Sequence, residues 1–586
     1  MAANDTMNAR RRTTEDLAPC DLVMKGGITS GVVYPAAVLA LKEKYRFHSV
    51  GGTSAGAIAA AAVAAAEYGR QSGPSGGSHP DKRGFDGLES LQEQLVRDGF
   101  LLGLFQPSRK LRPLFAFLVG ILGRKLSFPA KVMAVVRVAL TRFWVVALAG
   151  GALGLLLLWG VVEAFSGDWT WNAGQLAIGA VVFGISAVLA AFGRLGIRLR
   201  TVFTKHLKDN FYGICSGVSE ENPSDDSVLT GWLYREIQQC AGRGADDPLT
   251  FGDLEAHQIN LNMMTTDLTR ARPTRLPDDL ASFWFCEQEL QRLFPKPVVE
   301  RLSDDSRVPE RIERDGRTYC RFPEDINELP VIVGTRMSLS FPVLLSGIPL
   351  YTASDDGTEL YQHWFSDGGI GSNFPIHFFD AWLPSRPTFG LNLIPAPTPN
   401  GVAPAGPRRA EIGDMAAFLG QVLDTMQNWR GTMQAELPGF SDRIRDIQLE
   451  GHEGGMNLNM TAETIEGLIE KGEEAGSYLR DAFSLERHRF TRFLTFMQMM
   501  DLGLRGPQGS GGVIEKFQAY RADLENGPPE GTLWLKGHDN EWCLSAAKET
   551  EILLAATGGW GPEPKVPFSD NDEPTPTPVM RVTPRV

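Results

Sequence analysis

Two long runs without a charged residue set the first constraint on how this chain folds. Residues 143–162 (FWVVALAGGALGLLLLWGVV) and 176–193 (LAIGAVVFGISAVLAAFG) contain 20 and 18 apolar or small residues. An α-helix rises about 1.5 Å per residue, so roughly 18–20 such residues cross the roughly 30 Å hydrocarbon core of a bilayer. Because the connection between the runs is short, the sequence predicts a transmembrane helical hairpin with spans at about 143–165 and 174–193. A helical hairpin buried inside a soluble protein is the alternative.

The residues around the hairpin carry a charge opposite to that of the rest of the chain. Segment 99–208 has thirteen Lys and Arg against two acidic residues, a formal charge of +11, whereas the whole chain carries −13 and the remainder therefore −24. The connecting loop has no basic residue, so the positive-inside rule places both ends of the hairpin in the cytoplasm. Basic residues at this position favour anionic lipids. Small residues at Gly150 and Gly154, and at Ala180 and Gly184, would let two helices pack closely.

Composition places the rest of the chain among ordinary globular proteins. It has 586 residues, of which 43% are hydrophobic and 22% charged, so collagen-like and wholly disordered classes are excluded. Six scattered cysteines without a Cys-x-x-Cys pair argue against a disulfide framework and a zinc ribbon. There is no Glu-x-x-His or closely spaced histidine pair, so we expect no metal and no cofactor. The acidic net charge argues against a nucleic-acid partner.

A serine between glycines gives the strongest signal of chemistry. Ser54 follows a short strand pattern and precedes an alanine-rich helix pattern, with Gly52 and Gly56 two residues away on either side. This is the context of a nucleophile elbow, in which small residues let strand and helix pass closely around a strained serine. The amide of Ala55, at the helix N-terminus, is then placed to hold an oxyanion. A second Gly-x-Ser-x-Gly match, at Ser75, lies in a Gly/Ser/Pro stretch and indicates a flexible loop. The alternative interpretation of Ser54 is a turn serine without a catalytic role.

A glycine-rich turn near the amino end supplies candidate oxyanion donors. Gly26, Gly27 and Ile28 follow a short apolar strand, and glycine turns of this kind expose backbone amides. A phosphate-binding loop is the alternative, but Gly-x-Gly-x-x-Gly is absent and no Gly-Lys-Ser/Thr follows.

A candidate general base lies far downstream. Asp367, followed by Gly368 and Gly369, ends an apolar strand, where a carboxylate can approach a serine hydroxyl. Taken alone, the same residues are typical of an ordinary Asp-Gly turn. A histidine triad is a further alternative, for which His377 is the best-placed histidine, although a structural histidine is the simpler interpretation.

Three motifs in a fixed order resemble the patatin-like phospholipases. They are KGG-x3-G at 25–31, GTSAG at 52–56 and DGG-x3-N-x-P at 367–375, and two further stretches, at 262–268 and 335–342, also resemble family landmarks. The resemblance implies a three-layer α/β/α fold with a central, mostly parallel sheet. It also implies a Ser–Asp dyad of Ser54 and Asp367, with the turn at 25–28 as the oxyanion loop. The chain departs from the family pattern at Ile28 and Ser30, where the family usually has glycine and a basic residue.

These observations predict a membrane-tethered serine hydrolase of the phospholipase A type that releases free fatty acid on the cytoplasmic face of a membrane. Its partners are the bilayer and membrane phospholipid, with anionic lipids favoured. An esterase or thioesterase acting on soluble acyl substrates is the first alternative, and a non-catalytic lipid-binding scaffold is the second. The expected organisation is a disordered N-terminus (1–19), the first catalytic part (20–98), the basic membrane insertion (99–208), the second catalytic part (209–395), a mostly helical C-terminal region (396–560) and a disordered Pro-rich tail (561–586).

Overall fold

The computed structural model describes most of the chain. It covers residues 17–72, 82–122, 140–166, 173–396 and 440–558, except 506–511, 527–539 and short gaps at 221, 223–224, 355–356, 358 and 456, together with residue 137 and scattered positions from 418 to 439. The serine match at Ser75, the tail 561–586 and residues 1–16 of the expected disordered N-terminus lie outside the described residues. Ala18 and Pro19, which were expected to be disordered, are instead the first residues of a strand.

Half of the central sheet is parallel and carries the residues of interest. Its strands run in the order β13-β12-β1-β2-β4, with every neighbouring pair parallel. The apolar β1 and the Gly-rich end of β2 lie in the middle of this half, buried on both faces, as is usual for parallel strands. The predicted α/β class is confirmed. The bounds are β1 (Ala18–Met24), β2 (Tyr45–Gly52), β4 (Asn260–Asp267), β12 (Thr388–Pro395) and β13 (Ile444–Leu449).

An antiparallel half continues the sheet beyond β4. The order β4-β11-β10-β6-β8-β7 is antiparallel throughout, and β5 also pairs with β4. A separate two-stranded parallel sheet is formed by β3 (Gly213–Cys215) and β9 (Val343–Leu345). The bounds of the antiparallel strands are β5 (Arg272–Leu276), β6 (Trp284–Cys286), β7 (Arg311–Arg314), β8 (Arg317–Arg321), β10 (Ile348–Ala353) and β11 (Leu360–Ser366).

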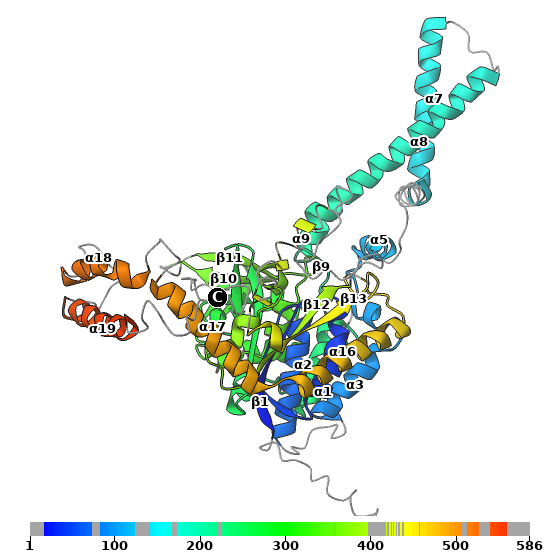
Figure 1. Cartoon of the computed structure of the whole chain (residues 1–586). Coiled ribbons are helices and arrows are strands. Elements are labelled where there is room, and N and C mark those ends of the chain that lie inside the picture. The colour runs from blue at the N-terminus through cyan, green and yellow to red at the C-terminus, as the bar shows by residue number, and fades with distance from the viewer. Residues whose placement is uncertain are drawn as a thin grey trace, which may run out of the picture.

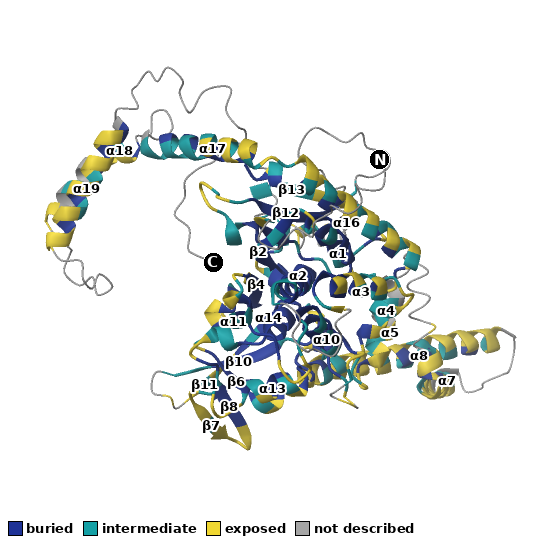
Figure 2. Ribbon diagram, turned by 90° about the horizontal axis from the view of Figure 1, so that it is seen from below, coloured by how far each residue is buried: buried dark blue, intermediate teal, exposed yellow. Residues whose placement is uncertain are grey.

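Helix α2 (Ala55–Gln71) is the central helix of the fold and is buried along most of its length (Figure 2). Alanine favours the helix and, having only a methyl group, lets α2 lie against β2 on one side and other helices on the rest of its surface. Its helical neighbours are α1 (Tyr34–Leu41), α3 (Phe85–Leu95), α10 (Leu229–Ala241), α11 (Phe251–Ala256) and α14 (Val331–Ser338). Two shorter helices, α12 (Glu287–Leu290) and α13 (Lys296–Leu302), lie near the antiparallel strands.

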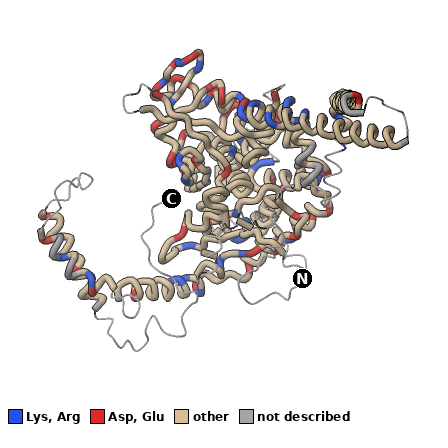
Figure 3. The backbone as a smooth tube through the Cα atoms, turned by 90° about the horizontal axis from the view of Figure 1, so that it is seen from above, with Lys and Arg blue, Asp and Glu red and all other residues tan. Residues whose placement is uncertain are grey.

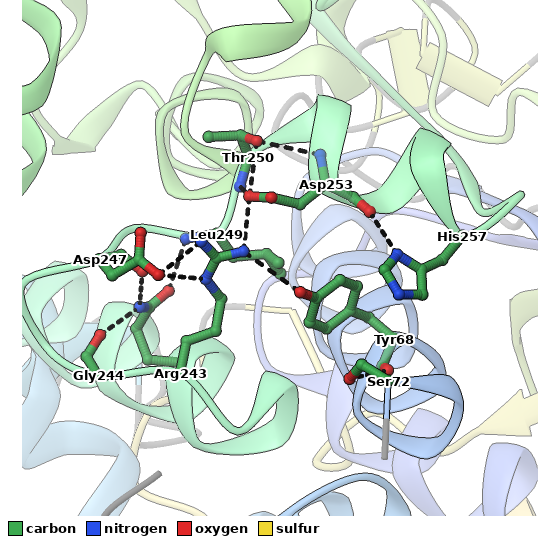
Figure 4. A network of polar contacts seen from close by, with 10 residues as sticks. Tyr68, Ser72, Arg243, Gly244, Asp247, Leu249, Thr250, Asp253 and His257 are labelled. Carbon is green, nitrogen blue, oxygen red and sulfur yellow. Dashed lines mark hydrogen bonds and ion pairs between the residues drawn. The ribbon is translucent and has the colours of Figure 1, made fainter. Parts of the chain in front are cut away.

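A polar network fixes the far end of α2 (Figure 4). The guanidinium of Arg243 contacts the carboxylates of Asp247 and Asp253 at 2.6 and 2.8 Å, and donates to the hydroxyl of Tyr68 at 3.4 Å. Tyr68 belongs to α2, whereas Thr250 caps α11 and forms a capping box with Asp253. The end of α2 that lies far from Ser54 is therefore tied to α11 through Arg243.

The central sheet extends past residue 395, which was predicted as the end of the second catalytic part. Strand β13 pairs with β12 from Gly390–Ile444 to Pro395–Leu449, so a strand of the C-terminal region is the edge of the parallel half. This boundary was wrong because the six-residue strand follows a long segment without a strand pattern. The rest of the region is largely helical, with α16 (Ala462–Ala482), α17 (Leu485–Arg505), α18 (Val513–Glu525) and α19 (Asn540–Gly558). Thr461 caps α16 by accepting from the amide of Thr464.

Helix α16 packs directly on α1 through two glycines. A Cβ on Gly472 would lie 2.1 Å from the carbonyl oxygen of Val33, and one on Gly476 would lie 2.2 Å from that of Ala37. The two helices therefore touch backbone to backbone, and α16 is part of the catalytic body.

Gly472→Ala should destabilise the protein by about 1–3 kcal/mol, because the added methyl has no space against α1. Gly467→Ala, in the same helix but with nothing within 4 Å of its Cβ position, should instead be neutral or stabilising by about 0.4–1 kcal/mol. Urea unfolding followed by circular dichroism measures both. Equal effects of the two substitutions would contradict the close packing of α16.

The opposite face of the parallel strands is covered by a different set of residues. Val23 of β1 packs with Phe374, Ile376 and Phe440, whereas its neighbours Leu22 and Met24 face the main core. Helix α17 closes this side, because His488 bonds Asp442 at 2.7 Å. Helices therefore lie on both faces of the parallel half.

The insertion forms a long helical hairpin that projects away from the sheet (Figure 1). After α4 (Phe100–Leu104) and α5 (Arg112–Leu122), α7 (Trp144–Ser166) runs outward and α8 (Ala173–Thr201) returns. A π-helical turn, η4 (Val202–His206), and α9 (Leu207–Asp209) continue α8 without a break to Asp209. The segment 126–136, upstream of α7, lies outside the described residues.

The hairpin is not a buried core element. Leu156 and Leu189 are 61% and 66% exposed, and both helices are long and apolar enough to cross a membrane. Gly150 and Gly154 lie at the crossing, where added Cβ atoms would meet Ala190 and Ser186 at 2.2 Å. Gly184 has nothing within 4 Å, so the expected second pair of small residues is not part of the contact. The first pair therefore lies in the close approach of the two helices, together with Gly151, whose added Cβ would lie 2.5 Å from the ring of Phe183.

Candidate active site

Ser54 occupies a strained turn between β2 and α2. Its backbone angles are φ 55° and ψ −126°, a conformation that residues with a side chain rarely adopt. Gly52 and Gly56 make the turn possible, because Cβ atoms there would lie 2.4 Å from the Gly56 carbonyl oxygen and 2.2 Å from that of Met24. Ser54 is only 4% exposed. The local geometry is that of the nucleophile elbow which the Gly-x-Ser-x-Gly pattern predicts.

Asp367 follows the last residue of β11 and is held by backbone groups. Its amide donates to the carbonyl of Ser340 at 2.9 Å, and its Oδ1 accepts from the amide of Gly369 at 2.7 Å. A Cβ on Gly368 would lie 1.9 Å from the carbonyl oxygen of Met264, so the turn needs glycine there. The second carboxylate oxygen, Oδ2, is buried and makes no hydrogen bond of ordinary geometry to a described residue.

The structure brings Ser54 and Asp367 together. Desolvation by burial raises the pKa of Asp367 to about 6, and hydrogen bonds from the Ser54 side chain and the Gly369 amide oppose that rise. A carboxylate with its pKa near 6 is ionised at neutral pH yet basic enough to take a proton from a serine. The side chains of two residues 313 positions apart in the chain thus lie close enough to interact.

The glycine turn at 25–28 lies beside the pair, but one of its expected donors is already used. The amide of Gly26 donates to the carbonyl of Asn373 at 2.8 Å, so Gly26 was wrongly included among the oxyanion donors. No hydrogen bond within the described part of the chain involves the amides of Gly27, Ile28 or Ala55. Ile28 is not among the residues with positive φ, so the side chain that replaces a glycine there imposes no backbone strain.

Three residues that sequence reasoning left without a role support the pair. Ser338 accepts the amide of Ser54 on its Oγ at 3.1 Å, and the carbonyl of Ser340 accepts the amide of Asp367. Arg336 donates to Oγ of Ser340 at 2.7 Å and is fully buried without a carboxylate partner. All three belong to the stretch at 335–342. Its resemblance to a family landmark was the only signal, because hydroxyl residues in such a run have no distinctive spacing.

No histidine among the described residues shifts the pKa of Asp367. His377 lies in the short helix η8 (Ile376–Phe379), with its ring edge-on to Phe378, and His363 pairs with Asp267 at 3.1 Å. The described residues also contain no cluster of three His, Cys, Asp or Glu side chains that could hold a metal ion.

An apolar cavity opens beside Ser54. Ile28 and Ala55 line it near the serine, and none of the described residues that line it is charged. A cavity of this character suits an apolar ligand. The site thus combines a candidate nucleophile, a candidate base, open amides and an apolar cavity.

Comparisons with known proteins agree with these features. The family model described as patatin-like phospholipase matches residues 22–73. The chain is 32% identical over 653 aligned positions to the RpoH suppressor of Rhizobium meliloti (strain 1021), covering 96% of this chain and 98% of that protein.

Solved structures were also similar, at low scores. VipD from Legionella pneumophila matches with 14% identity and a TM-score of 0.26, over 92% of this chain and 86% of VipD. ExoU in the ExoU–SpcU complex of Pseudomonas aeruginosa matches with 13% identity and a TM-score of 0.25, over 93% of this chain and 67% of that one. Both TM-scores are too low for either similarity to bear on function. The family model and the full-length relative show that the chain belongs to the patatin-like phospholipase family, which supports a lipid hydrolase.

Proposed function

We propose that the chain is a membrane-tethered serine hydrolase of the phospholipase A type, acting through a dyad of Ser54 and Asp367. The observation that carries the proposal is the buried pair itself. Ser54 sits in an elbow with φ 55°, beside a carboxylate whose pKa is raised to about 6. Neither feature serves packing, because positive φ and a desolvated carboxylate both cost stability.

The reaction runs in two stages on this chain's own residues. Ser54 Oγ attacks the carbonyl carbon of an acyl ester while Asp367 accepts the hydroxyl proton. The amides of Gly27, Ile28 and Ala55 hold the oxyanion. As the ester C–O bond breaks, Asp367 returns the proton to the leaving alcohol. Water then attacks the acyl-enzyme, again losing a proton to Asp367, and free fatty acid leaves while Ser54 recovers its proton.

In this proposal the hairpin anchors the chain in the membrane. Its apolar helices are exposed, and α8 carries no charged residue from Ala173 to Gly193 (Figure 3). Arg194, Arg198 and Arg200 follow directly, where they would meet anionic headgroups. Tethering raises the effective concentration of phospholipid at the enzyme.

Fatty-acid release from phospholipid vesicles tests the activity. Full-length protein reconstituted from detergent should release fatty acid, and release should be faster from vesicles containing anionic phosphatidylglycerol than from pure phosphatidylcholine. The advantage should shrink at high salt, which screens the basic residues. Hydrolysis of soluble acyl esters with no release from either vesicle would favour the soluble-substrate esterase instead.

Cysteine labelling tests the topology. Gln175→Cys, near the outer end of α8, should react with a membrane-impermeant maleimide added to intact cells. Asp246→Cys, at an exposed position next to α10, should react only after lysis. The six native cysteines are all buried, so the unmodified chain gives a low background. Labelling of both positions, or of neither, in intact cells would contradict a hairpin with cytoplasmic ends.

A further inference from the structure

The cavity beside Ser54 is lined in part by the insertion. Leu101 and Leu104 of α4, and Phe105 after it, line the same apolar cavity as Ser54. These residues are the first of the basic segment that contains the hairpin. Leu104 and Phe105 are buried, and Leu101 is half-buried.

The two ends of the insertion are joined close to this cavity. The amide of Ser108, on the way into the hairpin, donates to the carbonyl of Ile214, on the way out, at 3.0 Å. Ile214 belongs to β3, which pairs with β9, and Leu344 and Leu345 of β9 also line the cavity. Figure 1 shows α5, α9 and β9 at the base of the hairpin. The segment that leads into the candidate membrane helices therefore lines the space next to Ser54, and the segment that leads out of them pairs with a strand that lines it.

Helix α4 is fixed in place. Gly99, with φ 72°, turns the chain sharply from α3 into α4. The ring of Phe100 packs edge-on against Trp232 of α10 at 5.6 Å, and the indole of Trp232 donates to Gln94 of α3. A wall held from both sides has a defined shape, so the length of an apolar ligand that it accepts is also defined.

The chemistry of the cavity fits one kind of occupant. None of the described residues that line it is charged. The hydroxyl of Tyr34, which also lines it, already donates to the carbonyl of Lys25 at 2.5 Å. The polar atom left for chemistry is the Ser54 hydroxyl. An apolar chain attached to an ester at one end matches this arrangement.

The geometry points to α4 and Phe105 as the acyl-chain wall of the site, so that the segment leading into the hairpin sets which fatty acyl chains are cleaved. This inference rests on the proposed function and assigns its acyl specificity. Each methylene group that the wall admits is worth roughly a fourfold gain in kcat/KM, because burial of a CH₂ contributes to binding in the transition state. A bulky side chain on the wall removes that gain for long chains.

The test is the ratio of kcat/KM for p-nitrophenyl laurate to that for p-nitrophenyl butyrate, both measured in the same detergent solution. Leu101→Trp should lower this ratio by about tenfold or more, because a drop of that size requires the exclusion of only two methylene groups from the cavity. Leu104→Ala, which enlarges the cavity, should raise the rate for palmitate relative to laurate. Leu102→Trp is the matched control, because Leu102 lies on the same helix but does not line the cavity, and its ratio should equal that of the unmodified chain.

The outcomes separate this inference from the proposed function. If the unmodified chain hydrolyses both esters and Leu101→Trp keeps the same ratio, the wall assignment is wrong and the hydrolase stands. If the unmodified chain hydrolyses neither ester nor vesicle lipid, the proposed function fails and the inference fails with it. A general folding defect lowers both rates together and leaves the ratio unchanged, and thermal unfolding of each variant identifies it. In that case Leu104→Ala is decisive. If its rate for palmitate relative to laurate equals that of the unmodified chain, the assignment of α4 and Phe105 as the acyl-chain wall is wrong.

Discussion

Asp367→Asn should lower the rate of fatty-acid release by about 10²–10⁴-fold, the usual contribution of a general base. Asparagine has the shape of aspartate and can still accept the Gly369 amide on its oxygen. It cannot take the proton of Ser54, so the nucleophile stays protonated. The rate of p-nitrophenyl butyrate hydrolysis by the purified variant measures the loss, with Asp246→Asn as the control because Asp246 is exposed.

The same substitution should stabilise the folded protein at neutral pH. The pKa of Asp367 is raised from 3.8 to about 6, so burial favours the protonated form. Its contribution to stability is fully present below the unfolded pKa near 4 and is lost as the pH rises through about 6. A neutral asparagine suffers no such loss, so at pH 8 the free energy of unfolding of the variant should exceed that of the unmodified chain by up to about 3 kcal/mol. The difference should vanish near pH 3.5.

Urea unfolding at several pH values measures this difference. An inactive Asp367→Asn variant that is less stable than the unmodified chain at pH 8 would show that the carboxylate is structurally required rather than held at a cost for catalysis. In the unmodified enzyme, activity should fall as the pH decreases through about 6, because the base becomes protonated.

Ser54→Ala should abolish fatty-acid release, with a loss on the order of 10⁶-fold, as is typical when a catalytic serine is removed. The variant keeps a Cβ in the same strained turn and should fold normally. Measurement of release from phosphatidylglycerol vesicles tests it. Ser75→Ala, in the second Gly-x-Ser-x-Gly match, is the control and should retain full activity.

Retention of release by Ser54→Ala would show that the nucleophile lies elsewhere. Retention of a biological role by an inactive Ser54→Ala chain would instead favour the scaffold alternative, because lipid binding does not need the hydroxyl.

The elbow and the Asp-Gly-Gly turn could be located from sequence because each depends on local sterics. Gly52, Gly56 and Gly368 sit where a Cβ would collide with backbone, so no other residue fits, and the pattern is visible in the letters alone. The hairpin was equally visible, since its length and lack of charge are properties of the segment itself. The class of fold followed from the family resemblance that these motifs carry.

The failures concern contacts between distant segments. Gly26 looked like an oxyanion donor until the carbonyl of Asn373 was found to accept its amide. Strand β13 could not be assigned to the sheet because its partner β12 lies beyond a long intervening segment. Ser338, Ser340 and Arg336 have no distinctive spacing in the sequence, and their contacts to the site are made only in the folded chain.

The sequence by itself determined the nucleophile turn, the acidic turn and the apolar hairpin, because backbone crowding and hydrophobic length act within a few residues. Only the tertiary structure decided that Ser54 and Asp367 meet, that burial raises the pKa of the carboxylate, and that the segment leading into the hairpin lines the apolar cavity beside Ser54. Those properties depend on which surfaces exclude water together, and water is excluded by residues hundreds of positions apart.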